Sequence, residues 1–350
     1  MPRLARDIEA SLVLVEPPRA VRAPDLPGRV LVAAFLGGDI GFGALTVLDG
    51  TDVAGTVDLW GTYELFRPRF VVGDLNHMYA GVGSDVDSVV ASFDVNTLTL
   101  LSQVTVVPDA GNQPGRPALD GDVLWVPSGE SDTGVFAVDV ANPNALTLLG
   151  SNTSADLAGA EAVAVGGAVF VAARLAGSAP SGRVTVLSNN PAAPAVLATV
   201  PVVLPTGLFL AGTTLFVAGN GDGATFGDTL TAIDVSNPAA PTVLSTLQDH
   251  TALRNAFKVL VVGTLAYATT SNGLTVVDVS NPGAMTVVTT VAGDMSGDVT
   301  RQGDRLYVGS GASGGVTVLD ISTPAAPAVE ATLTGPAVAG ATGVEAVGVV

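Results

Sequence analysis

The segment Gly273-Leu-Thr-Val-Val-Asp-Val-Ser-Asn-Pro282 decides the fold, because versions of it recur roughly every 45 residues along the 350-residue chain. Six further copies, some strong and some weak, begin at Ala44, Val89, Gly134, Gly182, Thr229 and Gly315. Seven copies of one strand-rich unit are typical of a radial or solenoidal repeat fold.

Each repeat is predicted to contain four strands. Residues 253–291 comprise an apolar run that ends at Gly263, a second run at 265–269, a turn at 271–273, the signature strand and a last run at 285–291. Glycine turns between short β-branched runs indicate consecutive antiparallel hairpins. The sequence therefore predicts an all-β fold, a seven-bladed β-propeller of four-stranded antiparallel blades, over residues 28–350.

The two ends of the chain resemble halves of one blade. Residues 342–350 are similar to the expected innermost strand at 159–166, and residues 28–35 are similar to the strand that follows it at 167–173. We expect the C-terminal strand to join the N-terminal blade and close the ring, which removes two exposed sheet edges.

The signature strand ends in an aspartate and a proline-containing turn. Asp234 and Asp320 precede Pro-Ala-Ala-Pro turns, and Asp278 precedes the turn that contains Pro282. Proline withholds a backbone donor, so the chain must leave the sheet there, and an aspartate can bond to nearby free N–H groups. We interpret these repeated aspartates as structural.

Composition narrows the classes of function. The net charge is −18, which disfavours binding to nucleic acids and to anionic membrane surfaces. The chain has no cysteine, so disulfides and thiolate metal sites are excluded, and its two histidines disfavour a histidine metal cluster. The single lysine, Lys258, stands against 13 arginines and is interpreted as a composition bias.

An N-terminal arm, residues 1–27, lies outside the repeats. It holds a strand-like run, Leu12, Val13, Leu14 and Val15, followed by prolines that favour an extended linker. We expect the run either to add to the edge of its own propeller or to bind a protein partner or a second copy by strand addition. No secretion signal is visible in the arm, and no apolar stretch is long enough for membrane insertion.

Acidic loops between the second and third strands are the candidate metal site. Two loops contain the candidate ligands, which are Asp85, Asp87, Asp222 and Asp228. Their carboxylate oxygens and flexible glycine or serine neighbours suit calcium, although neither loop has the full spacing of a known calcium-binding loop. The alternative is a solvated acidic rim that maintains solubility. No other cofactor is expected.

The signature segment and the run that precedes it, Gly263-Thr-Leu-Ala-Tyr-Ala268, resemble the LVIVD repeat. The resemblance extends over residues 30–350 and is strongest in repeats five to seven. It implies a β-propeller of the kind found mostly in bacterial and archaeal surface or secreted proteins, and therefore a location at a cell surface or outside the cell. The arm and the missing signal add a virion as an alternative, and the missing signal leaves the cytoplasm open. It transfers no catalytic motif.

These observations favour a non-catalytic β-propeller, a structural or protein-binding module, and therefore no enzyme. One alternative is a virion or appendage protein anchored by its arm. Another is a metal-dependent hydrolase or lactonase, which requires polar side chains on several inner strands. The inner-strand candidates for that chemistry are Glu161, Asn255, Asp298 and Glu345.

Overall fold

The computed structural model describes most of the chain except its N-terminal arm and several loops. The described residues are 29–35, 43–59, 65–83, 87–107, 114–129, 134–174, 182–221, 225–311 and 314–347. The predicted arm at 1–27, with its partner-binding run Leu12 to Val15, lies outside them. That prediction therefore stays a prediction.

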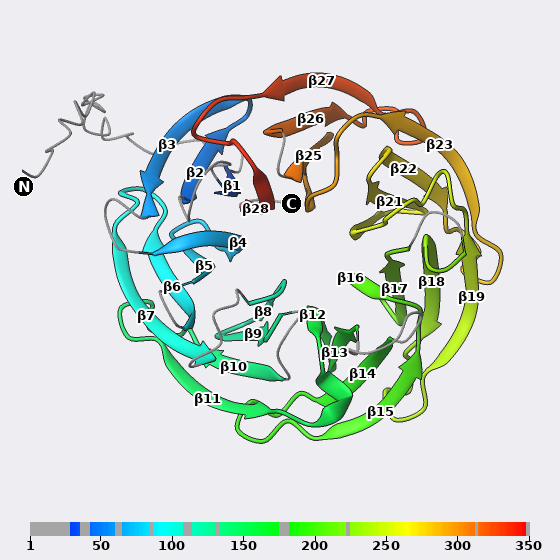
Figure 1. Ribbon diagram of the computed structural model, residues 1–350, viewed down its shortest axis with the longest axis horizontal. Helices are drawn as coiled ribbons and strands as arrows, with labels where there is room; N and C mark the ends of the chain where they lie inside the picture. The colour runs from blue at the N-terminus through cyan, green and yellow to red at the C-terminus, as the bar shows by residue number, and fades with distance from the viewer. Residues whose placement is uncertain are drawn as a thin grey trace, which may run out of the picture.

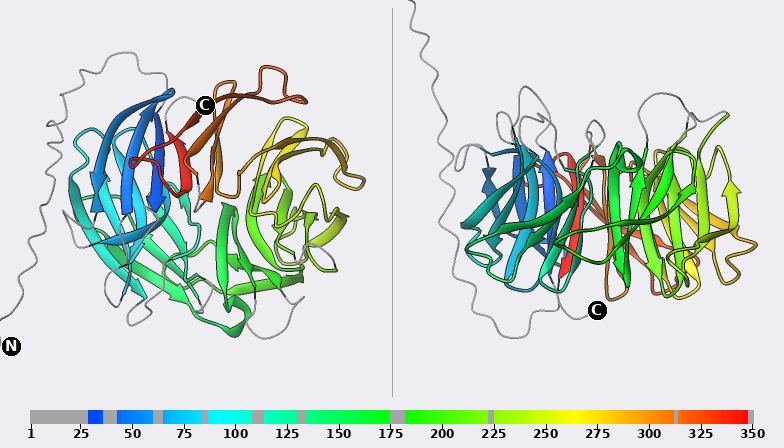
Figure 2. Two further views of the ribbon diagram at one scale, coloured as in Figure 1. Left: turned by 45° about the horizontal axis from the view of Figure 1, so that its top comes forward. Right: turned by 90° about the horizontal axis from the view of Figure 1, so that it is seen from below.

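The described strands form seven four-stranded antiparallel sheets, which are arranged as blades in a ring (Figure 1). Seen from the side, the strands run between the two faces of the ring (Figure 2). The predicted all-β, seven-bladed propeller is confirmed. Within the described residues, no helix has the length and apolar character needed to span a membrane.

The blades follow one another along the chain, and the strands of each are named from the channel outwards. Blade 1 contains β28 (Ala341–Val347), β1 (Arg29–Phe35), β2 (Gly43–Asp49) and β3 (Asp52–Asp58), and blade 2 contains β4 (Phe66–Gly73), β5 (His77–Gly83), β6 (Ser88–Asp94) and β7 (Leu100–Val107). Blade 3 contains β8 (Ala118–Asp120), β9 (Val123–Pro127), β10 (Val135–Asp139) and β11 (Thr147–Asn152), and a short 3₁₀ helix, η1 (Ala155–Leu157), follows it. Blade 4 contains β12 (Ala160–Gly166), β13 (Ala168–Ala173), β14 (Arg183–Ser188) and β15 (Val196–Pro201).

The last three blades span residues 205–333. Blade 5 contains β16 (Pro205–Ala211), β17 (Thr214–Gly219), β18 (Thr229–Asp234) and β19 (Thr242–Gln248). Blade 6 contains β20 (Lys258–Val262), β21 (Leu265–Thr270), β22 (Gly273–Asp278) and β23 (Thr286–Ala292), and blade 7 contains β24 (Val299–Gln302), β25 (Arg305–Gly309), β26 (Val316–Asp320) and β27 (Ala328–Leu333). The signature strand is the third strand of each blade.

The ring closes through the last strand. β28 pairs antiparallel with β1, in a register that places Val344 opposite Val32 and Glu345 opposite Leu31. The C-terminal strand is thus the innermost strand of a blade whose other three strands come from the N-terminal part of the chain. This confirms the predicted closure, which pairs the two strand edges at the seam between the ends of the chain.

The core lies between the blades. Each pair of neighbouring blades encloses one apolar cluster of the described residues. The signature strand is covered on both faces, so in β22 every residue from Gly273 to Val277 is buried. The outer strand β23 alternates between exposed and half-buried positions. Small β-branched side chains and alanines fill the narrow space between sheets, in agreement with the low aromatic content.

The repeated turns behave as the sequence predicts. Gly263, between β20 and β21, has a φ of 60°, a left-handed conformation that glycine adopts without steric cost. Asp278 accepts a hydrogen bond of 2.8 Å from the backbone N–H of Ser280, and Asp234 and Asp320 do the same with Ser236 and Ser322. These hydrogen bonds lower the pKa of all three carboxyls. The structural interpretation of the aspartates fits this geometry.

The proline turns also join neighbouring blades, which the sequence did not indicate. The Ser245 hydroxyl of blade 5 donates to the Pro282 carbonyl of blade 6 at 2.6 Å. The Tyr267 hydroxyl of blade 6 donates to the Pro324 carbonyl of blade 7 at 2.9 Å. Each turn therefore ends a strand and offers its carbonyl to the blade before it.

Candidate active site in the central channel

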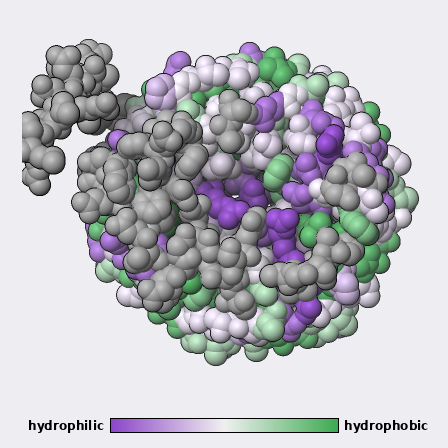
Figure 3. Space-filling view, viewed as in Figure 1, coloured by the Kyte–Doolittle hydropathy of each residue, from purple (hydrophilic) through white to green (hydrophobic). Residues whose placement is uncertain are grey.

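A cavity of about 290 Å³ occupies the centre of the ring, and we call it the channel cavity. The innermost strands of all seven blades, or the residues just before them, contribute to its wall. Figure 3 shows hydrophilic residues gathered around the hollow at the centre of the ring. The apolar part of the wall includes Phe70, Phe209 and Leu260, and the polar part includes Arg116, Lys258, Asp298, Thr300 and Glu345.

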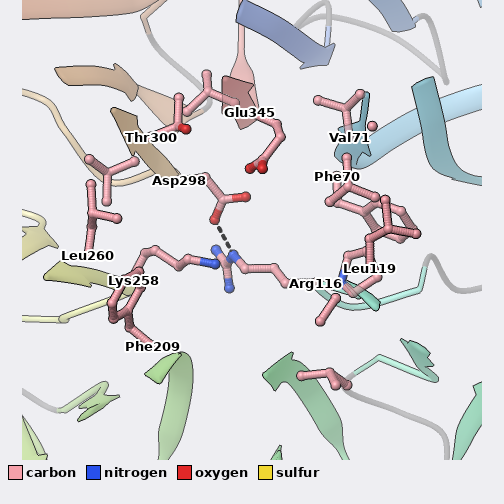
Figure 4. A pocket seen from close by; sticks show the side chains of 17 residues that line it. Phe70, Val71, Arg116, Leu119, Phe209, Lys258, Leu260, Asp298, Thr300 and Glu345 are labelled. Atoms are coloured by element: carbon pink, nitrogen blue, oxygen red, sulfur yellow. Dashed lines mark hydrogen bonds and ion pairs between the residues drawn. The ribbon is translucent and has the colours of Figure 1, made fainter. Parts of the chain in front are cut away.

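Four charged side chains point toward one another in this cavity (Figure 4). Glu345 comes from β28, Asp298 stands just before β24, Lys258 begins β20, and Arg116 stands just before β8. Asp298 and Arg116, which come from blades 7 and 3, form an ion pair across the channel. The ring therefore brings together groups that lie far apart in the sequence.

Backbone contacts between inner strands fix these side chains. The N–H of Arg116 donates to the Glu161 carbonyl at 2.7 Å, and the Arg116 carbonyl accepts from the N–H of Val163 at 2.9 Å. The N–H of Asp298 donates to the Thr342 carbonyl of β28 at 3.1 Å. The N–H of Ala346 donates to the Thr300 hydroxyl at 2.9 Å, which holds β28 beside β24.

A glycine allows two of the inner strands, β16 and β20, to approach each other closely. A Cβ atom on Gly207 of β16 would lie 2.8 Å from the Cα of Lys258 and even nearer to the Phe257 carbonyl oxygen. Because real Cβ atoms do not approach backbone so closely, any larger residue at position 207 would displace the start of β20. Gly207 thus sets the position of Lys258 in the channel.

Glu345 has a pKa well above the usual value for a glutamate side chain. Its side chain is partly open to the channel but surrounded by the ring, and burial raises its pKa from 4.5 to about 7. The negative charge of Asp298 adds to this rise, while the positive charge of Lys258 opposes it. A carboxyl group that titrates near neutral pH can take up and release protons under ordinary conditions.

The four candidates on the inner strands do not all meet. Asp298 and Glu345 face each other in the channel cavity, whereas Glu161 lines a separate cavity at the end where the inner strands begin. Asn255 lies in the turn before β20 with a φ of 48°, where its backbone N–H donates to Asp228.

The predicted calcium ligands fall in two blades. Asp87 begins the segment that leads into β6, and Asp228 precedes β18, on the opposite side of the ring in Figure 1. Asp85 and Asp222 lie outside the described residues. Asp228 is fully buried, and its carboxylate contacts the His250 Nδ1 at 2.9 Å and the N–H of Asn255 at 2.8 Å. Asp228 therefore anchors the loop before β20.

No metal centre is evident in the part of the chain that the structure describes. There, no group of three or more histidine, cysteine, aspartate or glutamate side chains stands where it could hold one ion. The calcium prediction stays a prediction, because it depends partly on residues outside that part.

Sequence reasoning missed Arg116 and Lys258 as site residues. The interpretation of Lys258 as composition bias overlooked its place in the fold, since the only lysine of the chain points into the channel. Arg116 stands before β8, a strand of three residues that carries little sequence pattern. The rarity of lysine was the one signal that could have drawn attention to Lys258.

The comparison with known families agrees with the repeat pattern. The LVIVD repeat family matches residues 224–249, 253–293 and 293–334. This part of the chain consists of LVIVD repeats. The match confirms the resemblance in repeats five to seven, where the sequence pattern is strongest. No curated protein of similar sequence was found.

Solved structures of similar shape are numerous but distant in sequence. A Lactobacillus plantarum protein has a TM-score of 0.73 at 15% identity, covering 92% of this chain and 99% of its own. A Bacteroides fragilis protein described provisionally as a 6-phosphogluconolactonase has a TM-score of 0.69 at 13% identity, covering 93% and 99%. The periplasmic gluconolactonase of Pseudomonas aeruginosa has a TM-score of 0.68 at 15% identity, covering 92% and 99%. At these identities the likeness establishes the fold.

The expectation that the chain is no enzyme is contradicted by these comparisons. Two of the similar structures are named as lactonases, so propellers of this shape include proteins named as enzymes. The absence of a catalytic sequence motif was therefore the wrong ground for exclusion. Catalytic groups in a propeller channel come from separate blades, and no local motif need connect them.

Proposed function

We propose that the protein is a hydrolase that cleaves a small cyclic ester, a lactone, in its central channel. The observation that carries this proposal is Glu345, a carboxyl group with a pKa of about 7 that shares a partly enclosed cavity with two cationic side chains and Asp298. A general base is most effective when its pKa lies near the working pH. The names of the two lactonases of similar fold support lactones as the first substrates to test.

The chemistry follows from the positions of the four charged groups. Ionised Glu345 removes a proton from a water molecule as its oxygen attacks the carbonyl carbon of the lactone. The tetrahedral intermediate carries a negative oxygen, which the cations of Arg116 and Lys258 stabilise. The ring C–O bond then breaks, and the protonated Glu345 returns its proton to the leaving alkoxide. The product is an open-chain hydroxy acid, which releases its own proton to solvent.

Asp298 acts on this reaction through Arg116. Its carboxylate pairs with the guanidinium and fixes the direction in which the remaining N–H groups point. The same guanidinium donates to the Thr206 carbonyl at 3.2 Å. Asp298 also holds the pKa of Glu345 up, because two carboxylates that face each other resist ionising together.

The decisive experiment is lactone hydrolysis by the purified protein. Loss of glucono-δ-lactone is followed with hydroxylamine, and the spontaneous rate in buffer is subtracted. We expect Glu345→Gln to lower kcat/KM on the order of a hundredfold, because the amide cannot accept the proton. The matched control is Glu330→Gln, an acid on the outer strand β27 that pairs with Arg305.

Two results would count against the proposal. Hydrolysis that persists unchanged in Glu345→Gln removes this residue as the base. A parent protein that accelerates no lactone, across γ- and δ-lactones of neutral and anionic sugars, removes the function itself.

A further inference from the structure

A second cavity, of about 170 Å³, lies at the end of the channel where the inner strands begin, and we call it the mouth cavity. Three arginines from neighbouring blades line it: Arg69 of β4, Arg116 before β8 and Arg174 after β13. Glu161 of β12 is the carboxylate among them and is 2% exposed. Its Oε2 lies 3.2 Å from Arg69, and its Oε1 lies 3.8 Å from Arg174.

Cations outnumber carboxylates among the described residues that line the mouth cavity. Arg69, Arg116 and Arg174 stand there against Glu161, and Asp298 reaches Arg116 from the channel side. Along the channel, Lys258 adds a further cation and Glu345 a further carboxyl group. The wall of this small space is therefore rich in positive charge, although the net charge of the whole chain is −18.

The arginines are held in place rather than free in water. The side chains of Arg69, Arg116 and Arg174 are 31%, 16% and 30% exposed. Glu161 lies between Arg69 and Arg174 and fixes both, as Asp298 fixes Arg116. Guanidiniums in a partly enclosed space of low dielectric attract an anion more strongly than the same groups on an open surface.

We infer that the mouth cavity binds the oxyanion group of a small molecule, a phosphate monoester or a carboxylate. Guanidinium groups match both anions, since their paired N–H donors fit two oxygens at once. Three converge here from blades 2, 3 and 4, while the acidic exterior repels large anions such as nucleic acids. The site thus selects a small anion that can enter the ring.

The mouth cavity and the channel cavity share Arg116 as a lining residue. Along β28, Thr342 lines the mouth and Glu345 lines the channel, three residues further on and therefore roughly 10 Å away. A ligand held by its anionic group at Arg69 and Arg174 extends toward Glu345. If lactone hydrolysis is also found, the substrate is an anionic lactone, although the binding site stands without it.

Calorimetric titration of the full chain with a matched pair of sugars tests the inference. Glucose 6-phosphate and glucose differ by the phosphate alone, and neither is hydrolysed as a lactone. We expect glucose 6-phosphate to bind, with an affinity that falls as salt is added, and glucose not to bind. Gluconate serves as the carboxylate probe. Whichever of glucose 6-phosphate and gluconate binds with the higher affinity shows whether the site prefers a phosphate or a carboxylate. If neither anion binds better than glucose, the inference is overturned.

Two substitutions with opposite expected effects separate binding from folding. Arg174→Gln removes one guanidinium and should weaken binding of glucose 6-phosphate about tenfold or more. Glu161→Gln removes the competing carboxylate and should tighten binding several-fold, even if it lowers the melting temperature. Arg305→Gln is the control that leaves affinity unchanged, because Arg305 is exposed, pairs with Glu330 and lines neither cavity.

The pair remains decisive if one variant does not fold. Unchanged affinity in a folded Arg174→Gln protein overturns the inference. So does weaker binding in Glu161→Gln, because a purely structural role for the cluster predicts loss in both variants. Absence of lactone hydrolysis together with anion binding removes the proposed function and leaves this site in place.

Discussion

The third strand and the innermost strand of each blade differ in what they repeat. On the third strands, Asp234, Asp278 and Asp320 make the same hydrogen bond in three blades. On or beside the innermost strands, Arg116, Lys258 and Glu345 occur once each and meet in the channel. Repetition in this sequence therefore marks the scaffold, and the chemistry gathers where the copies differ.

The largest effect is expected from removing an innermost strand that also closes the scaffold. Deletion of residues 340–350 removes β28, which closes the ring and carries Glu345. The deletion takes the buried side chains of Ala341, Val344 and Val347 out of the core, and the edge of β1 that paired with β28 becomes exposed. The free energy of unfolding should fall by on the order of 5 kcal/mol or more. Melting followed by circular dichroism measures it, and an unchanged melting temperature would refute the closure.

The next largest effect concerns the channel alone. Lys258→Met removes a cation that holds the pKa of Glu345 down, so that pKa should rise above about 7. The activity of a general base appears as it ionises, so the pH at half-maximal kcat/KM should move upward. The plateau should fall about tenfold to a hundredfold, because oxyanion stabilisation is lost. Lys258→Arg keeps the charge and serves as the control. If the pH at half-maximal kcat/KM does not change in Lys258→Met, Lys258 does not influence the pKa of Glu345.

Glu345 also links the channel to stability. In the unfolded chain its carboxyl ionises near 4.5, but in the folded protein near 7. Between these values the folded state holds the extra proton, so the free energy of unfolding falls as pH rises from 4.5 to 7. Glu345→Gln abolishes that loss and should be more stable than the parent at about pH 8, by on the order of 3 kcal/mol. At about pH 4 the two should melt alike, and an equal difference at both pH values would contradict the raised pKa.

The features that the sequence predicted correctly depend mostly on residues that lie near one another in the chain. The turn at Gly263, the aspartate bonds and the strand order arise from residues near one another in the chain, and the closure could be inferred from similarity between its two ends. The channel site, in contrast, depends on residues that are distant from one another in the chain. Arg116, Lys258 and Glu345 come from three blades, and only the closed ring brings them together.

Part of the candidate site was nevertheless within reach of the sequence. Asp298 and Glu345 stood among the inner-strand candidates, but they lie 47 residues apart in the chain, and nothing in the sequence indicated that they meet. The elevated pKa of Glu345 depends on burial within the ring and on Asp298 and Lys258, which belong to other blades. The acidic loops drew more attention because their charges cluster locally. Charge that clusters in sequence and charge that converges in space are different signals in a propeller.

The smallest effect is expected in the repeated scaffold, and it tests whether the two regions are independent. Asp278→Asn keeps an oxygen that can accept from the N–H of Ser280 but removes the negative charge that strengthens the bond. The melting temperature should fall slightly at neutral pH, and the difference should vanish as pH falls below 3.8 and through the lowered pKa of Asp278, where the parent loses the same charge. Lactone hydrolysis and glucose 6-phosphate binding should stay at parent levels, because β22 is the third strand of its blade and contributes no residue to the described wall of either cavity. A stable Asp278→Asn protein that has lost either property would show that the repeated strand also takes part in function.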